Sequence, residues 1–286
     1  MIGAIIGDIV GSRFEFNNHK SKDFELFADG CRPTDDTVMT LAVAKSLMVT
    51  EHIKETADNL EGDYGGAQTL LKNVSLTYMQ NFGQRYPDSG YGGLFFRWIF
   101  DELPRPYNSF GNGAAMRISP VGHVAQTADE VTVMSKIVTG VSHNHPEGLK
   151  GAEAVAMAVF LARRGLSKEA LREKLRSYYP LDETIDTIRQ TYAPSTACQN
   201  SVPQALTAFL DSTSFEDAIR NAVSIGGDSD TLAAITGSVA EAFYGVPEDL
   251  EATALSYLDE ALSATVAEWN AFMVTRLHNE AAGQNE

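Results

Sequence analysis

The chain has 286 residues, of which 44% are apolar and 21% charged, and its formal net charge is −16. These proportions are typical of a globular protein with a sizeable core. The acidic excess argues against nucleic acid as a partner, because binding to phosphate backbones needs clustered Lys and Arg. An anionic membrane surface is disfavoured for the same reason, and no apolar stretch approaches the roughly 18 residues needed to span a bilayer.

The first residues, MIGAIIGDIVGSRFEF, are apolar but do not predict an export signal, because a basic region is missing and Asp8 interrupts the run. The two cysteines, Cys31 and Cys198, lie outside any CxxC spacing and are expected to be free thiols. We therefore expect a cytoplasmic protein, and we expect it to be a monomer.

Helical patterns dominate the chain, whereas signals for strands are sparse. Small residues recur every fourth position at Gly3, Gly7 and Gly11, which predicts a helix that packs closely against another backbone. Further along, Thr127 to Glu130 reads as a capping box, Ser167 as an N-cap and Gly165 as a helix end. Helices are expected near residues 39–48, 127–141, 148–165, 167–179, 214–227 and 248–277.

No linker or low-complexity segment divides the sequence. We therefore expect an all-α fold in a single domain, residues 1–276, followed by a polar and frayed tail, residues 277–286. The zone richest in loop-forming residues runs from Asn81 to Asn112, and loops of this length inside a compact domain are often functional.

Two pairs of carboxylates each open an apolar helix: Asp35 and Asp36 in TDDT, and Asp228 and Asp230 in GGDSDT. Either pair alone is compatible with ordinary capping, because carboxylates accept hydrogen bonds from free amides and suit the helix dipole. If the two helix starts face each other, however, four carboxylates share one pocket. Two unit charges about 4 Å apart repel by about 4 kcal/mol at an effective dielectric of 20. Hard divalent cations would offset this repulsion, since all-oxygen sites suit Mg²⁺, Mn²⁺ or Ca²⁺.

Two other acidic motifs fit the sequence less well. An EF-hand loop needs oxygen ligands, a glycine and a glutamate where this chain has Leu232, Ala233 and Val239. The aspartate-rich helices of terpenoid synthases usually carry a second acidic pair three residues after the first, and here Met39 takes that position.

Five motifs, GDIVGSRFE, TDDT, GNGAAMR, SHNHPEG and GGDSDT, resemble those of the ADP-ribosylglycohydrolases and follow the family order from about Ile2 to about Gly245. The resemblance implies a compact orthogonal helical bundle whose central cleft holds two divalent cations, Mg²⁺ or Mn²⁺. It implies a metal-dependent hydrolase that cleaves the glycosidic bond between ADP-ribose and an acceptor, foremost a protein arginine side chain. The partner would be an ADP-ribosylated protein or a small ADP-ribosyl compound. An O-linked substrate, or a sensor that binds ADP-ribose without cleaving it, stays open as the alternative.

The resemblance also assigns the metal ligands to both helix starts. Glu15 matches a family glutamate near the metals and the ribose, and its role as ligand, gate or base stays open. Asp35 and Asp228 are, with Glu15, the candidate catalytic residues. The implied metal ligands are Thr34, Asp35, Asp36, Asp228, Asp230 and Thr231.

Substrate contacts are implied first in SFGNGAAMR. There Gly111 and Gly113 would let backbone amides reach a diphosphate as a backbone nest, because glycine permits positive φ and has no Cβ. Asn112 and Met116 would line the pocket. Arg117 would offer charge or support a loop, or else form a structural salt bridge.

Two further segments complete the implied ligand site. Tyr91 and Gly92, in DSGYGG, suggest a close approach of the backbone to the ligand. Asp88 in the same segment is either a catalytic carboxylate or a turn residue, and the turn is favoured. His143 would lie near the ADP-ribose, or else be a hydrogen-bonded histidine at a helix end.

Overall fold

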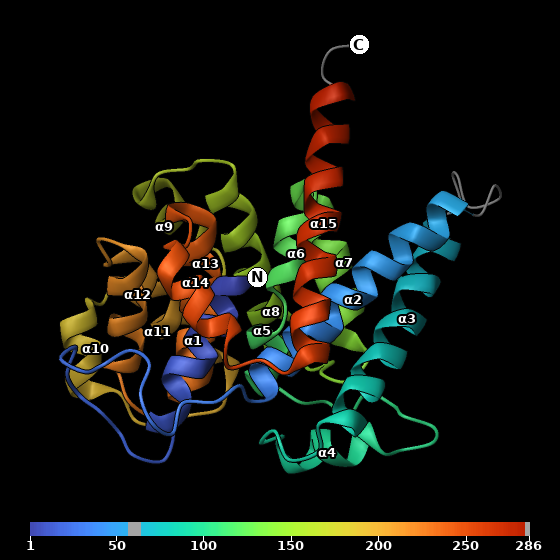
Figure 1. Ribbon diagram of the computed structural model, residues 1–286. Helices are drawn as coiled ribbons and strands as arrows, with labels where there is room; N and C mark the ends of the chain where they lie inside the picture. Colours follow the sequence, from blue (N-terminus) through green and yellow to red (C-terminus); the bar gives the residue numbers. More distant parts are fainter. Residues whose placement is uncertain (57–63, 284–286) are drawn as a thin grey trace.

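The computed structural model describes residues 1–56 and 64–283, and every regular element in these ranges is a helix (Figure 1). The one β-type pairing found among them is an isolated bridge between Gly111 and Ala197. The prediction of an all-α fold is therefore confirmed. In these same ranges, none of the helices has the length and apolarity that a bilayer-crossing segment requires.

The first half of the described chain contains the helices α1 Ile2–Gly11, η1 Ser12–Phe14, α2 Asp35–Thr56, α3 Tyr64–Arg85, α4 Gly93–Ile99, α5 Gly113–Met116, α6 Ser119–Val124 and α7 Ala128–Gly140. The second half contains α8 Pro146–Arg163, α9 Lys168–Leu175, α10 Ile185–Thr191, α11 Cys198–Leu210, α12 Phe215–Val223, α13 Ser229–Tyr244, α14 Glu248–Leu255 and α15 Glu260–Gly283.

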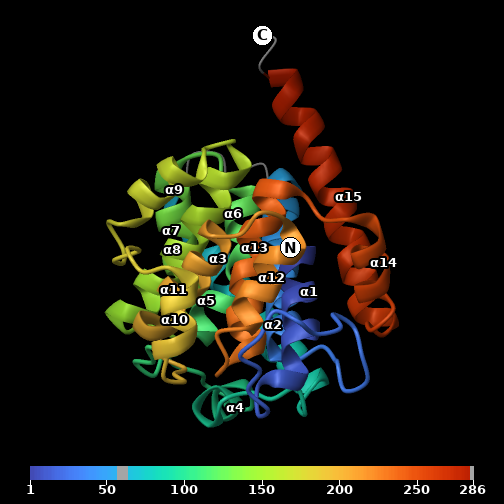
Figure 2. The same ribbon diagram turned by 90° about the vertical axis from the view of Figure 1, so that its left-hand side faces the viewer.

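The centre of the fold is the pair α1 and α13, which lie side by side in both ribbon views (Figures 1 and 2). Every residue of α1 is buried. A Cβ added at Gly7 would lie 2.0 Å from the carbonyl oxygen of Ala233, and one at Gly3 would lie 2.2 Å from that of Gly237. The two backbones are thus in direct contact, as the spacing of the small residues predicts.

Several predicted helix ends are confirmed by their hydrogen bonds. The Thr127 side chain accepts from the Glu130 amide at the start of α7, and Ser167 accepts from the Ala170 amide at the start of α9. Gly165 follows α8 with a φ of +79°, the left-handed conformation that favours glycine after a helix.

Two expectations about helix extent were wrong. The segment near 248–277 forms two helices, because the Asp259 carboxylate accepts from the Leu262 amide at 2.9 Å and begins α15 anew. Helix α15 then continues past Leu277 to Gly283, and its C-terminal part extends beyond the other helices in Figures 1 and 2. Residues 284–286 of the expected tail lie outside the described residues. The zone from Asn81 to Asn112 contains the end of α3 and all of α4 as well as loops.

We expect Gly7→Ala to destabilise the protein by about 3 kcal/mol or more, because the new methyl group would overlap the α13 backbone, which cannot move aside as a side chain would. Gly140→Ala is the matched control. A Cβ there meets no atom within 4 Å, and the change should be neutral or stabilising by up to about 1 kcal/mol. Urea denaturation of both variants checks this, and equal midpoints would contradict close α1–α13 packing.

Candidate functional site

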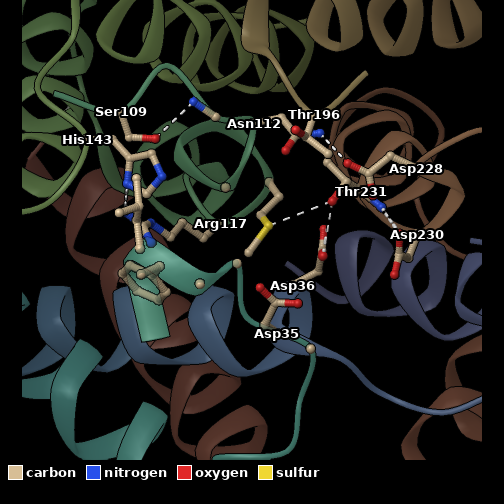
Figure 3. Close-up of a pocket in the computed structure, with 18 of the residues that line it drawn as sticks. Asp35, Asp36, Ser109, Asn112, Arg117, His143, Thr196, Asp228, Asp230 and Thr231 are labelled. Carbon is tan, nitrogen blue, oxygen red and sulfur yellow. Dashed lines mark hydrogen bonds between the residues drawn. The ribbon is translucent and has the colours of Figure 1, made fainter. Parts of the chain in front are cut away.

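One cavity of about 380 Å³ is lined from both acidic helix starts, from residues 111–113, here called the glycine loop, and from His143 (Figure 3). Its size is within the range of small-molecule sites. The predicted site residues that line it are Glu15, Asp35, Asp36, Gly92, Gly111, Asn112, Gly113, Met116, His143, Asp228, Asp230 and Thr231.

The two acidic helix starts face each other, as the paired motifs led us to expect. The Thr231 hydroxyl, at the start of α13, donates to Asp36 Oδ2, at the start of α2, at 3.2 Å. Carboxylate oxygens of Glu15, Asp228 and Asp230 all lie within 4.8 Å of one another. Oxygens of Asp36 and Asp230 belong to a second such group, so Asp230 is common to both groups.

Asp8 is the third member of that second group, and the sequence reading missed it. Its carboxylate is fully buried and accepts hydrogen bonds from the amides of Thr34 and Thr37 at 2.8 and 3.0 Å. It also accepts from both threonine hydroxyls. Because these donors occupy both of its oxygens, we interpret Asp8 as the cap that fixes the start of α2. The Thr34 hydroxyl donates its proton to Asp8 at 2.6 Å, and its oxygen accepts from the Asp36 amide at 3.4 Å.

The position of Asp228 depends on the turn that precedes it. Gly226 and Gly227 both have positive φ, +73° and +80°, which most other residues adopt only with strain. Asp228 Oδ2 then accepts from the Asn112 side-chain amide at 2.6 Å. This bond joins the glycine loop directly to the acidic cluster, by which we mean the carboxylates of Asp8, Glu15, Asp35, Asp36, Asp228 and Asp230.

The acidic cluster is held against strong mutual repulsion. Burial, together with the charges of Asp8 and Asp228, raises the pKa of Asp35 to about 8. Burial and neighbouring carboxylates also raise the pKa values of Asp36 and Asp230 well above the ordinary range. None of the ion pairs among residues 1–56 and 64–283 involves these carboxylates.

One buried carboxylate oxygen of the acidic cluster has no hydrogen-bond partner within the described part of the chain. Asp36 Oδ1 is buried and receives no hydrogen bond there. An unpartnered carboxylate oxygen among other all-oxygen donors is what a hard divalent cation requires. The acidic cluster therefore fits a metal centre.

The glycine loop differs from the expected backbone nest. Neither Gly111 nor Gly113 has a positive φ, so that part of the expectation was wrong. The Gly111 amide donates to Ser109 Oγ at 3.1 Å and the Asn112 amide to the Thr196 carbonyl at 2.7 Å. Because these amides are already used within the protein, the loop offers a ligand few free backbone donors. A Cβ at Gly113 would lie 3.5 Å from His143 Nε2, so its lack of a side chain keeps this histidine accessible.

Three predicted residues do not line the cavity. Asp88 is exposed in a turn, in agreement with the favoured interpretation. Tyr91 packs beside Phe95, with ring centroids 5.8 Å apart. Thr34 is buried behind the acids through its bond to Asp8.

Other lining residues were not predicted: Leu94, Phe95, Tyr107, Ser109 and Thr196. They come from loops and from the short helix α4, where apolar and hydroxyl side chains carry no distinctive sequence signal. The loop-rich zone from Asn81 to Asn112 contains all of them except Thr196, and Ser109 also begins the segment SFGNGAAMR.

The whole chain, residues 1–285, matches the ADP-ribosylglycohydrolase family, and the protein belongs to this family. It is 25% identical to the human ADP-ribosylhydrolase ARH3, over 90% of this chain and 88% of that protein. It is 29% identical to the ADP-ribosylarginine hydrolase Tri1 of Pseudomonas putida (strain GB-1), over 90% of this chain and 73% of that protein. A solved structure described as an ADP-ribosylglycohydrolase-related protein complex has the same fold, with a TM-score of 0.58 and 22% identity over 92% of this chain and 94% of that one.

The raised pKa values predict how metal-free stability depends on pH. In the unfolded chain aspartate titrates near 3.9, whereas Asp35 in the fold titrates at about 8. Between these values the folded state holds protons that the unfolded state has released, so this contribution to stability falls as pH rises from about 4 to 8.

Asp35→Asn removes this titration. In EDTA, the melting temperature of the variant should therefore fall less between pH 5 and 8 than that of the wild type. Added Mn²⁺ should also raise the melting temperature of the variant less than that of the wild type. Asp129→Asn, at an exposed position in α7, is the control and should behave as the wild type. Identical pH profiles of Asp35→Asn and the wild type would contradict the buried repulsion.

Proposed function

We propose that the protein is a metal-dependent hydrolase that cleaves the bond between ADP-ribose and an acceptor, and that the acceptor is a protein arginine side chain. The observation that supports this best is a single cavity in which a carboxylate cluster and the glycine loop are joined by the Asn112–Asp228 hydrogen bond. The ligands of the acidic cluster would be Thr34, Asp35, Asp36, Asp228, Asp230 and Thr231, and they would hold two divalent cations, Mg²⁺ or Mn²⁺.

The cations, when bound, would supply positive charge that holds the ribose hydroxyls and makes a water molecule more acidic. The protein's own contribution to proton transfer is assigned to Glu15. This side chain is half-buried at the cavity wall, and its pKa is raised by burial and by the charge of Asp228, which makes it a stronger base than an exposed glutamate. A general base is most effective when its pKa lies near the working pH.

In the proposed reaction, Glu15 takes a proton from a water molecule while the oxygen of that water attacks the anomeric carbon of the ribose. The bond from this carbon to the guanidino nitrogen breaks, and the proton passes to the departing nitrogen. Asp35 and Asp228 line the same cavity and would stabilise the positive charge that develops on the ribose.

Arginine is proposed as the acceptor for two reasons. One relative is named an ADP-ribosylarginine hydrolase, and its identity, 29%, is higher than the 25% of the human ARH3 relative reported above. The chain is also strongly acidic, with a net charge of −16, which favours the approach of a cationic acceptor segment. O-linked ADP-ribosyl compounds remain the competing substrates in the test.

The test is to incubate the protein with ADP-ribosylated arginine, serine and DNA substrates, with and without Mg²⁺ or Mn²⁺, and to measure free ADP-ribose. We expect release from arginine, dependent on metal. Full activity after exhaustive chelation would exclude the metal centre, and release from serine alone would exclude the arginine assignment.

Asp228→Asn separates an enzyme from a sensor. The variant keeps the side-chain shape and an oxygen that can accept from Asn112, but it loses the negative charge, so turnover should fall by at least about 100-fold while ADP-ribose binding persists. Asp129→Asn is again the control and should turn over as the wild type. A wild-type protein that binds ADP-ribose tightly but releases none from any substrate would be a sensor.

A further inference from the structure

His143 lines the cavity on the side away from the acids, and its two ring nitrogens have different surroundings (Figure 3). Nδ1 lies 2.9 Å from Ser142 Oγ and 3.3 Å from Arg117 Nη2. Nε2 faces the glycine loop, where a Cβ at Gly113 would lie 3.5 Å away and one at Gly111 3.8 Å away.

The neighbours of Nδ1 decide where the imidazole proton resides. The Arg117 guanidinium can only donate hydrogen bonds, so Nδ1 beside it must accept. Ser142 Oγ already accepts from Arg117 Nη2 at 2.8 Å, and its own proton is then free to point to Nδ1. A proton on Nδ1 would point toward the Arg117 guanidinium, and its acceptor would be the remaining lone pair of Ser142 Oγ, which already receives a hydrogen bond from Arg117. A bare Nδ1 instead accepts from both neighbours. The proton of the neutral ring therefore belongs on Nε2.

We propose that Arg117 is a positioning residue that, with Ser142, holds His143 as the neutral tautomer protonated on Nε2 and directs this N–H into the cavity. The inference rests on the proposed function in one respect, because ADP-ribose is the ligand that this donor would meet. The glycine loop makes the donor important, because the amides of Gly111 and Asn112 are already used within the protein.

The surroundings of Arg117 do not provide the structural salt bridge that was one of its possible roles. The side chain is fully buried, and no carboxylate among the described residues pairs with it. Its guanidinium carbon lies 4.8 Å from the centre of the Phe95 ring, and its Nε and Nη1 have no hydrogen-bond partner among residues 1–56 and 64–283. A buried cation without a counter-ion reduces stability, which argues for a role other than stabilising the fold.

The backbone around the histidine keeps this arrangement in place. The amides of Ser142 and His143 both donate to the Thr139 carbonyl, at 3.2 and 3.0 Å, and the Ser142 carbonyl accepts from Tyr107 at 3.0 Å. Burial and the charge of Arg117 also lower the pKa of His143 well below its ordinary value. The ring is therefore neutral at physiological pH, in agreement with the geometry.

The experiment is ¹⁵N NMR of ligand-free protein labelled on histidine, because bare and protonated ring nitrogens have well-separated shifts. His143→Gln assigns the His143 signals. We expect the wild type to show a protonated Nε2 and a bare Nδ1. Arg117→Met should give a mixture of tautomers or an imidazolium, and its ADP-ribose affinity in calorimetry should fall about tenfold or more. Arg97→Met, at an exposed position on α4, should match the wild type in both measurements.

Each outcome decides the assignment. A wild-type His143 protonated on Nδ1 would overturn it, as would an Arg117→Met protein with an unchanged tautomer and unchanged affinity. If Arg117→Met fails to fold, Ser142→Ala provides the second test, since Arg117 alone must then keep the proton on Nε2, and a proton on Nδ1 would overturn the inference. A wild type with the expected tautomer but no affinity for ADP-ribose would support the role of Arg117 and refute the proposed function.

Discussion

Mutual repulsion among buried carboxylates is the physical constraint on which the rest of this structure depends. Asp8, Asp35, Asp36, Asp228 and Asp230 come together in a partly or fully buried setting, and burial raises the pKa of each of them. The neighbouring carboxylates raise the pKa values of Asp35, Asp36 and Asp230 further. Only a rigid frame can hold them together. The backbone contact between α1 and α13 provides that frame, because a Cβ at Gly11 would lie 2.6 Å from the Asp230 Cα.

The two halves of the cavity are not independent. Asn112 reaches from the glycine loop to Asp228, and the Asn112 amide is anchored to the Thr196 carbonyl. A shift of the glycine loop on ligand binding would thus move the Asp228 carboxylate, which accepts the Asn112 hydrogen bond. Conversely, a cation that draws Asp228 toward itself would pull on the loop, so occupancy at either end should affect the other.

The sequence predicted the parts of the site that depend on local patterns. Acids at two helix starts predict neighbouring carboxylates, and glycines at every fourth residue predict close helix packing. The contact between Thr231 and Asp36 and the backbone contact between α1 and α13 confirm both predictions. Asp8 was missed because it stands among apolar residues and its partners, Thr34 and Thr37, are distant in sequence. The bonding of the Asn112 amide was missed for the same reason, because its acceptor is the carbonyl of Thr196, which is distant in sequence.

The pairing of α1 with α13 has a consequence for synthesis of the chain. Their contacts join residues as far apart as Gly3 and Glu241, separated by 238 positions. Helix α1 is synthesised long before α13, and all of its residues are buried in the fold. Contacts between such distant segments form slowly, and unpaired apolar segments favour association with other chains. The ten residues of α1 therefore need protection in the nascent chain until α13 has been made, and the acidic cluster is incomplete until then.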